Sequence, residues 1–371
     1  MKITRIALML LLGIMLMSGI ACGGGGEPSP TSTPTTYEWT LTQLTFSGGH
    51  AAISSISADG TKIAFQSFLG NDGSEIFIVN SDGSGLTQLT FSGGQAANPS
   101  INADGTKIAF MSLEFVSSVS ILDNYTLGTV TVDDDASEIF IINSDGSGLN
   151  QLTSNTVIDS MPSISADGTK IAFANGDFGI SIVNSDGSGL TQLTSNTIED
   201  GVSSISADGT KIAFMSSVDK DNSEIFIVNS DGSGLTQLTS NTALDGMPSI
   251  SADGTKIAFM SMEFVSMVDN FESEIFIVNS DGSGLTQLTF SGGQAAYPSI
   301  SADGTKIAFQ SFFGNDDYEI FIVNSDGSGL TQLTSNTVED RFPSISGDGT
   351  KIAFPSRVSS DSEIFLLELM P

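Results

Sequence analysis

The sequence has very little positive charge and almost none of the residues that form crosslinks or act as bases. Of 371 residues only 12 are lysine or arginine, against 43 aspartate or glutamate, and there is one cysteine, one histidine and one tryptophan. The net charge of −31 argues against nucleic-acid binding, because nothing here could neutralise a phosphate backbone. A lone cysteine excludes intramolecular disulfides, so the fold must be stable without them.

Residues 1–21 have the pattern of an export signal. Two basic residues precede an apolar run over residues 6–17, which is too short for a convincing transmembrane span. Cys22 follows directly, and the sequence around it resembles the signal of bacterial lipoproteins, which implies a lipidated cysteine. An ordinary signal peptide with an incidental cysteine is the alternative. Residues 23–37 are rich in glycine, proline and threonine, which predicts a flexible tether.

What the sequence does contain is a repeat. The stretch from Ser57 to Phe65 (SADGTKIAF) occurs seven times with at most one residue changed, and its aspartate returns at intervals of 41 to 63 residues. The seven aspartates are Asp59, Asp104, Asp167, Asp208, Asp253, Asp303 and Asp348. A self-similar unit of this period indicates a solenoid, a propeller or an array.

Each repeat predicts four antiparallel strands. In the second unit, residues 98–102 and 107–111 are β-rich and flank an Ala-Asp-Gly turn, which is a strong hairpin signal. The third strand, residues 75–80 in the first unit, has consecutive apolar residues, which indicates burial on both faces. A Ser-Asp-Gly-Ser-Gly turn then leads to a more polar strand at residues 86–90, as expected for an outer strand.

The strand count favours a closed ring over an open array. The first three strands occur seven times, but the fourth follows only six of them, and its seventh copy is Leu41 to Thr45 near the other end of the chain. This N-terminal strand would complete the last sheet and remove the exposed edges. We therefore predict an all-β fold, a seven-bladed β-propeller of four-stranded antiparallel blades over residues 38–371, closed by the N-terminal strand.

The repeat resembles a known family. Residues 342–354 (FPSISGDGTKIAF), followed by 362–366 (SEIFL), are similar to the WD40-like repeat of TolB-like propellers. The resemblance covers residues 38–371 and implies the propeller fold, while the export signal and Cys22 separately indicate an exported, cell-envelope protein. Because the motif builds the blade, it implies no activity.

Motifs for chemistry are weak. Asn80 to Gly85 is similar to the start of a calcium loop, but Phe91 stands where a bidentate glutamate is needed, so we interpret it as a turn. His50 occupies the place of a glutamine in other repeats, which favours a polar loop residue, and no Gly-x-Ser-x-Gly elbow is present. Arg341 and Arg357 cannot supply the arginine cluster of a sialidase-like site. We predict no catalytic residue, no metal site and no cofactor.

The loops after the second strand and between repeats vary, whereas the two glycine turns do not. In an antiparallel blade both variable sets emerge at the same end, and they hold 21 of the acidic residues. Such a surface should attract cationic partners or divalent cations, although it could equally be a solvated surface that keeps the protein soluble. The apolar residues in the same loops favour binding. The candidate ligand-binding residues are Phe115, Asp133, Asp134, Asp135, Phe264, Asp269, Phe313 and Asp316.

The leading hypothesis is a monomeric cell-envelope propeller that binds a protein, a peptide or another ligand through this variable face. The partner is expected to be cationic, and the membrane is expected to be contacted only through the lipid on Cys22. The main alternative is a carboxylate-dependent hydrolase acting on glycans, and a purely structural envelope protein is a third possibility. A carboxyl pair with one strongly raised pKa in a central cleft would favour the enzyme.

Overall fold

The computed structural model describes residues 38–46, 48–68, 73–91, 93, 95–113, 136–176, 179–195, 200–219, 222–264, 271–290, 292–312 and 317–370, without the side chains of Phe264 and Phe271. Every regular element in these residues is a β-strand, as the repeat predicts. None of these residues forms a helix long and apolar enough to span a membrane.

The strands form seven four-stranded antiparallel units, which we call blades 1 to 7 and which are consistent with the predicted count. From blade 1 to blade 7 the innermost strands are β2 (His50–Ile56), β6 (Ala96–Ile101), β10 (Asp159–Ile164), β14 (Asp200–Ile205), β18 (Leu244–Ile250), β22 (Ala296–Ile300) and β26 (Ser344–Ile345). The second strands are β3 (Lys62–Phe68), β7 (Lys107–Leu113), β11 (Lys170–Asn175), β15 (Lys211–Asp219), β19 (Lys256–Phe264), β23 (Lys306–Ser311) and β27 (Lys351–Val358). The third strands are β4 (Ser74–Asn80), β8 (Ser137–Asn143), β12 (Gly179–Asn184), β16 (Asn222–Asn229), β20 (Phe271–Asn279), β24 (Glu319–Asn324) and β28 (Asp361–Leu369). The outer strands are β5 (Thr87–Gln88), β9 (Asn150–Gln151), β13 (Thr191–Gln192), β17 (Thr236–Gln237), β21 (Thr286–Gln287), β25 (Thr331–Gln332) and, in blade 7, β1 (Trp39–Gln43).

The aspartate of the repeat holds the turn between the first two strands. Asp59 Oδ1 accepts hydrogen bonds from the hydroxyls of Ser57 and Thr61 and from the Thr61 amide. The next residue, Gly60, has a φ of +68°, a conformation that glycine adopts without a steric penalty. The Asp-Gly pair therefore sets the hairpin in the way that the sequence predicts.

A phenylalanine from each second strand forms the centre of each blade. All seven of these side chains are fully buried. In six blades this ring lies 5.6 to 6.1 Å, centroid to centroid, from the phenylalanine opposite it on the third strand. Blade 3 differs, because Ser181 lies opposite Phe173.

The outer strands of blades 1 to 6 are shorter than predicted, and a threonine side chain explains why. In blade 1 only Thr87 and Gln88 pair as a strand, whereas five residues were expected. Leu89 still donates its amide to Ile76 O at 2.8 Å, but the Ile76 amide donates to Thr90 Oγ1 at 2.9 Å. The Thr90 hydroxyl thus replaces the backbone carbonyl that would accept the next hydrogen bond between the two strands, and the strand pairing ends there.

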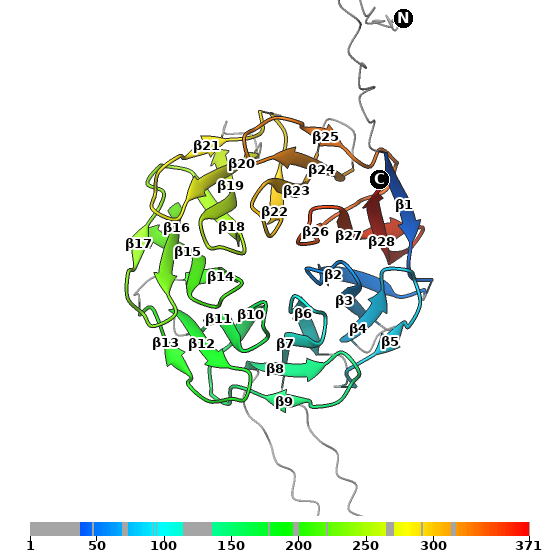
Figure 1. Cartoon of the computed structure of the whole chain (residues 1–371), viewed down its shortest axis with the longest axis horizontal. Coiled ribbons are helices and arrows are strands. Elements are labelled where there is room, and N and C mark those ends of the chain that lie inside the picture. The colour runs from blue at the N-terminus through cyan, green and yellow to red at the C-terminus, as the bar shows by residue number, and fades with distance from the viewer. Residues whose placement is uncertain are drawn as a thin grey trace, which may run out of the picture. The chain divides into compact units, whose positions relative to one another are not determined.

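The blades follow one another around a ring (Figure 1), and backbone contacts link each blade to the next all the way round. Hydrogen bonds of 2.9 to 3.2 Å link each Ala-Asp-Gly turn to the next, and the last one, from the Gly347 amide to Ala58 O, returns to blade 1. Each repeat lysine spans a seam as well, since its Nζ donates to the glycine carbonyl of the next turn at 3.1 to 3.3 Å. The repeated turn and lysine thus form a closed circle of equivalent contacts between blades.

The predicted closure by the N-terminal strand is confirmed. β1 pairs antiparallel with β28 in a five-residue register that joins Trp39 to Leu369 and Gln43 to Phe365. Thr45 Oγ1 then accepts the amide hydrogen of Ile364 at 2.9 Å, as Thr90 does for Ile76 in blade 1. Without β1, the third strand of blade 7 would be an open sheet edge.

Candidate functional site

The two ends of the blades differ as the sequence predicts. The repeated Ala-Asp-Gly and Asn-Ser-Asp-Gly-Ser-Gly turns lie at one end, which we call the uniform face. The connections after the second strand and between blades lie at the other end, the variable face. In the turns of the uniform face, such as that at Asp82, Oδ1 accepts from the Ser84 hydroxyl and amide, and these bonds lower the pKa of the carboxyl.

Most of the sequence-predicted site residues lie outside the described part of the chain. This applies to Cys22 and to the loop residues Phe115, Asp133, Asp134, Asp135, Asp269, Phe313 and Asp316. Phe264 is the last residue of β19, where its backbone pairs with Phe271 of β20. The structure therefore leaves these ligand-binding assignments as predictions.

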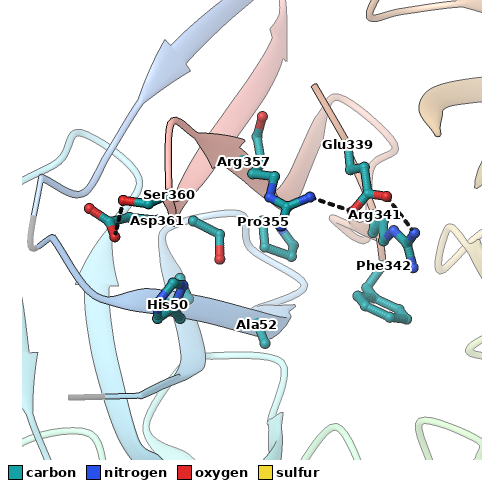
Figure 2. Close-up of a pocket in the computed structure, with 12 residues that line it drawn as sticks. His50, Ala52, Glu339, Arg341, Phe342, Pro355, Arg357, Ser360 and Asp361 are labelled. Carbon is teal, nitrogen blue, oxygen red and sulfur yellow. Dashed lines mark hydrogen bonds and ion pairs between the residues drawn. The ribbon is translucent and has the colours of Figure 1, made fainter. Parts of the chain in front are cut away.

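A pocket of about 240 Å³ opens on the variable face at the seam between blades 7 and 1, and we call it the seam pocket (Figure 2). Its walls come from the start of β2, from the connection that leads into blade 7, and from the β27–β28 hairpin. The lining residues are His50, Ala51, Ala52, Glu339, Arg341, Phe342, Pro355, Ser356, Arg357, Ser360, Asp361 and Ser362.

Two arginines converge on one glutamate in this pocket (Figure 2). Arg341 Nη2 lies 2.9 Å from Glu339 Oε1, and Arg357 Nη1 lies 3.7 Å from Glu339 Oε2. The Arg341 guanidinium also lies over the ring of Tyr318, 4.5 Å from its centroid, a cation–π geometry. The Tyr318 hydroxyl in turn donates to Gln294 Oε1 at 2.6 Å, which fixes the ring.

Backbone pairing creates this arrangement. The Arg341 amide donates to Pro355 O at 3.2 Å and the Arg357 amide donates to Glu339 O at 3.1 Å. Asp340, between these two bonds, pairs with Ser356 as an antiparallel bridge. Because side chains alternate along an extended segment, Glu339 and Arg341 share the pocket side while Asp340 turns inward and is completely buried.

This cluster is not predicted from the sequence, in which two arginines are too few for a sialidase-like site and His50 stands in the place of a repeat glutamine. The structure brings these three together, and they are the only arginines and the only histidine after residue 37. The sequence offers one signal for this cluster, because none of the three residues belongs to a repeat motif. The meeting of Arg341 and Arg357, which are 16 residues apart, depends on the tertiary structure.

A second group of carboxylates lies inside the blades. In six blades the glutamate that begins the Glu-Ile-Phe motif accepts a hydrogen bond from the threonine that ends the outer strand. The pairs are Glu75–Thr90, Glu138–Thr153, Glu224–Thr239, Glu274–Thr289, Glu319–Thr334 and Glu363–Thr45. This glutamate also accepts an amide hydrogen from the inter-blade connection, for example that of Asn155 at 2.6 Å from Glu138 Oε1. The motif thus anchors the variable connection to its blade.

At three seams a buried aspartate joins the glutamate. Asp159, Asp245 and Asp340 are each completely buried. In each case Oδ2 accepts from an asparagine side chain at 2.8 Å, while Oδ1 has no hydrogen-bond partner. Burial raises the pKa of Asp159 and of Asp245 to about 6, and it also raises the pKa of Asp340.

These aspartates do not form a catalytic cleft in the described residues. None of the three lines the seam pocket. Carboxyl pairs with a raised pKa therefore exist, as a hydrolase would require, but they lie inside the blade seams. The sequence predicts acidic side chains exposed on the variable face. Four of them, these three and Asp200, are instead buried.

Blade 3 has no glutamate at the position that begins the Glu-Ile-Phe motif in the other blades. Gly179 stands at the glutamate position, and a Cβ there would lie 2.5 Å from Thr194 O. The Thr194 hydroxyl donates instead to Asp200 Oδ2, at 2.5 Å, from the following connection. Asp200 thus accepts the threonine hydrogen bond that a glutamate accepts in the other six blades. Within the described ranges, no group of three or more histidine, cysteine or acidic residues lies together as a metal site would require.

The architecture defines the chain as a β-propeller, and comparison with known proteins agrees. Residues 200–370 match the family model described as the TolB beta propeller domain. The structure is similar to oligogalacturonate lyase from Vibrio parahaemolyticus, with a TM-score of 0.66, 13% identity, and coverage of 90% of this chain and 97% of that chain. It is also similar to the propeller domain of the Trilobed protease from Pyrococcus furiosus (TM-score 0.61, 12% identity, 86% and 97% covered) and to a putative TolB from Agrobacterium tumefaciens (0.52, 17%, 91% and 99%).

These matches confirm the resemblance to TolB-like propellers that the repeat motif indicates. No curated protein matches the chain by sequence. At identities of 12% to 17% the structural similarities define the fold, and the function has to be argued from the site.

Proposed function

We propose that this chain is an exported, envelope-located propeller that binds a protein or peptide through its variable face, with the seam pocket as the anchoring point. One observation carries the proposal: the only histidine and the only arginines after residue 37, none of them part of a repeat motif, line one pocket on that face. In a chain whose repeats are otherwise nearly identical, such a gathering supports a role beyond folding.

The pocket offers groups suited to a polar segment. Arg357 is 59% exposed, and its ion pair with Glu339 spans 3.7 Å, so a ligand carboxylate can approach its guanidinium directly. Phe342 and Pro355 supply apolar wall next to it. The acidic loops of the variable face would attract a partner that is basic overall, while one of its acidic groups binds Arg357.

The proposed lipid on Cys22 would hold the domain at a membrane through the tether of residues 23–37, which continues into β1.

The test is capture of a partner from envelope extract by the purified protein. The Arg341→Ala/Arg357→Ala variant should lose the captured partner, because both guanidiniums are removed. Asp231→Asn on the uniform face is the control, since it changes an exposed charge far from the pocket, and it should capture as well as the parent. Equal capture by the arginine variant and the parent would contradict the proposal.

The alternative function is a glycan-directed, carboxylate-dependent hydrolase. It is favoured by two carboxylates, Glu339 and Asp361, that line the seam pocket together with His50. Release of reducing ends from acidic and neutral polysaccharides would show such an activity, and Glu339→Gln should abolish it. Absence of release with the parent protein would leave binding as the function.

A further inference from the structure

The seam pocket lies at a seam that lacks a side chain found at two of the other seams. In blade 1 the Gln66 side chain reaches across to blade 2, where its Oε1 accepts the amide hydrogen of Asn98 at 2.9 Å. Gln310 of blade 6 reaches Phe342 of blade 7 in the same way, at 2.8 Å. Blade 7 carries Pro355 at this position, directly after the repeat phenylalanine, and proline has no such polar side chain. The pocket of about 240 Å³ opens where this side chain is missing.

Arg357 is the least compensated cation of the pocket. Arg341 forms the closer ion pair with Glu339, at 2.9 Å, so these two charges largely cancel. Arg357 lies 3.7 Å from the same glutamate, too far for a hydrogen bond, and its side chain is exposed. The other carboxylate of the lining, Asp361, accepts a hydrogen bond from the Ser360 hydroxyl at 3.1 Å, and in Figure 2 it lies on the far side of Arg357 from Glu339. The Arg357 guanidinium therefore keeps donors for a ligand.

The wall beside Arg357 is apolar and fixed in place. Pro355 precedes Arg357 by two residues in β27, so both side chains lie on the same face of the blade. Phe342 packs edge-on against Tyr297, with 4.6 Å between the ring centroids. The apolar residues of the lining are Ala51, Ala52, Phe342 and Pro355. A carboxylate bound by Arg357 would therefore have apolar surface next to it.

The volume and the lining together select what enters. A space of about 240 Å³ is smaller than the roughly 300 to 1,000 Å³ of typical ligand sites, so it suits a single residue rather than a peptide segment. An acidic side chain within a peptide brings polar backbone behind its carboxylate, and an acidic sugar brings hydroxyl groups, which an apolar wall leaves unpaired. A chain that ends in an apolar residue carries its carboxylate and an apolar side chain on the same carbon atom.

We propose that the seam pocket binds a carboxylate whose neighbouring carbon carries an apolar group, as in the C-terminal residue of a protein or peptide. The carboxylate accepts hydrogen bonds from Arg357, and the apolar group packs against Phe342 and Pro355. This binding mode rests on the proposed function, because it specifies which part of the partner enters the pocket. A free acid such as isocaproate has the same chemistry without the rest of the chain.

Ligand-observed NMR titration of the purified protein with N-acetyl-Ala-Ala-Leu tests the site. The free-acid form should bind saturably, and the C-terminal amide should bind at least tenfold more weakly, because it lacks the charge that pairs with Arg357. N-acetyl-Ala-Asp-Ala amide, whose carboxylate is internal, should also bind at least tenfold more weakly than the acid. Isocaproate separates the two sources: binding as tight as that of the tripeptide acid indicates a free acid, and clearly weaker binding indicates a chain end. No saturable binding of the tripeptide acid, or equal binding of this acid and either amide, would overturn the proposal.

Two variants in the pocket should change the binding of the tripeptide acid in opposite directions. Arg357→Gln removes the guanidinium and should lower the affinity for the acid to that for its amide. Glu339→Gln removes the carboxylate that competes for Arg357, so it should bind the acid several-fold more tightly and the amide as before. Asp231→Asn is the matched control, since it changes the net charge by the same one unit at the uniform face, and it should bind like the parent. Equal gains in Glu339→Gln and Asp231→Asn would reduce the effect to net charge and refute the site.

A filled variant tests the pocket without changing its charge. Pro355→Gln places at this seam the residue that blades 1 and 6 carry, so the protein should keep the circular dichroism of the parent while binding of the acid is blocked. Full binding of the acid by this variant would count against the pocket. The binding mode and the proposed function can fail separately. If capture from envelope extract depends on the arginines but the acid and its amide bind alike, the binding mode is wrong while the proposed function stands.

Discussion

The buried aspartates at the blade seams should make this protein more stable when they are uncharged. Asp159 is completely buried, and its Oδ1 is unpaired while Oδ2 accepts from Asn155. Its folded-state pKa of about 6 is above the ordinary value of 3.8. A raised pKa means that the stabilising contribution is complete below the unfolded-state pKa and is lost as the pH rises through the folded-state pKa. The loss therefore falls between about pH 4 and pH 7.

The size of the effect follows from the shift. A change of about two pKa units corresponds to about 3 kcal/mol between the two protonation states. Asp159→Asn keeps the shape and an acceptor for Asn155 but has no charge to bury. We expect the variant to be about 2 to 3 kcal/mol more stable than the parent at pH 7.5, and the gap to fall below about 1 kcal/mol at pH 4.

Urea unfolding of parent and variant at a series of pH values measures this gap. Asp245→Asn should behave in the same way, because burial also raises the pKa of Asp245 to about 6. The two sites belong to different seams, so their effects should add in the double variant. Asp231→Asn is the control: hydrogen bonds from Ser233 lower the pKa of that carboxyl, so its replacement should not stabilise the protein at pH 7.5. A gap for Asp159→Asn that does not change with pH would refute the reasoning.

Two further predictions concern the N-terminal part of the chain. Deleting residues 38–46 removes the strand that covers β28, and urea unfolding should show a loss of several kcal/mol; a truncated protein as stable as the parent would contradict the role of β1 in closure. Cys22→Ala should move the protein from membrane to soluble fractions after cell fractionation, since it removes the predicted lipid; a parent that is already soluble and unlipidated would show that the assignment is wrong.

Features repeated in every blade were predictable from the sequence. The Asp59–Gly60 turn needs a carboxylate and a residue that accepts positive φ, and both are visible in the sequence. The copy at Leu41 to Thr45 indicated closure because strands must be paired, and β1 pairs with β28 accordingly. The exact end of the outer strands was less predictable, because a threonine hydroxyl replaces a backbone acceptor there.

Features that occur once, or at only some seams, were not predictable. The meeting of Arg341 and Arg357 at Glu339 depends on pairing between segments 16 residues apart. The inward turn of Asp340 follows from alternation in a segment whose register only the fold sets. In the same way, nothing in the sequence shows that Asp200 replaces a missing glutamate, because that exchange joins two separate parts of the chain.

By itself the sequence determined the class of fold, the position of the turns and the strand that closes the ring, because these depend on local patterns repeated seven times. Tertiary structure alone decided which charges meet, which carboxyl groups are buried and where cavities form. Those properties depend on the few residues that differ between blades, such as Ser181 and Pro355. Their neighbours are set by the packing of one blade against the next, and local sequence does not encode that contact.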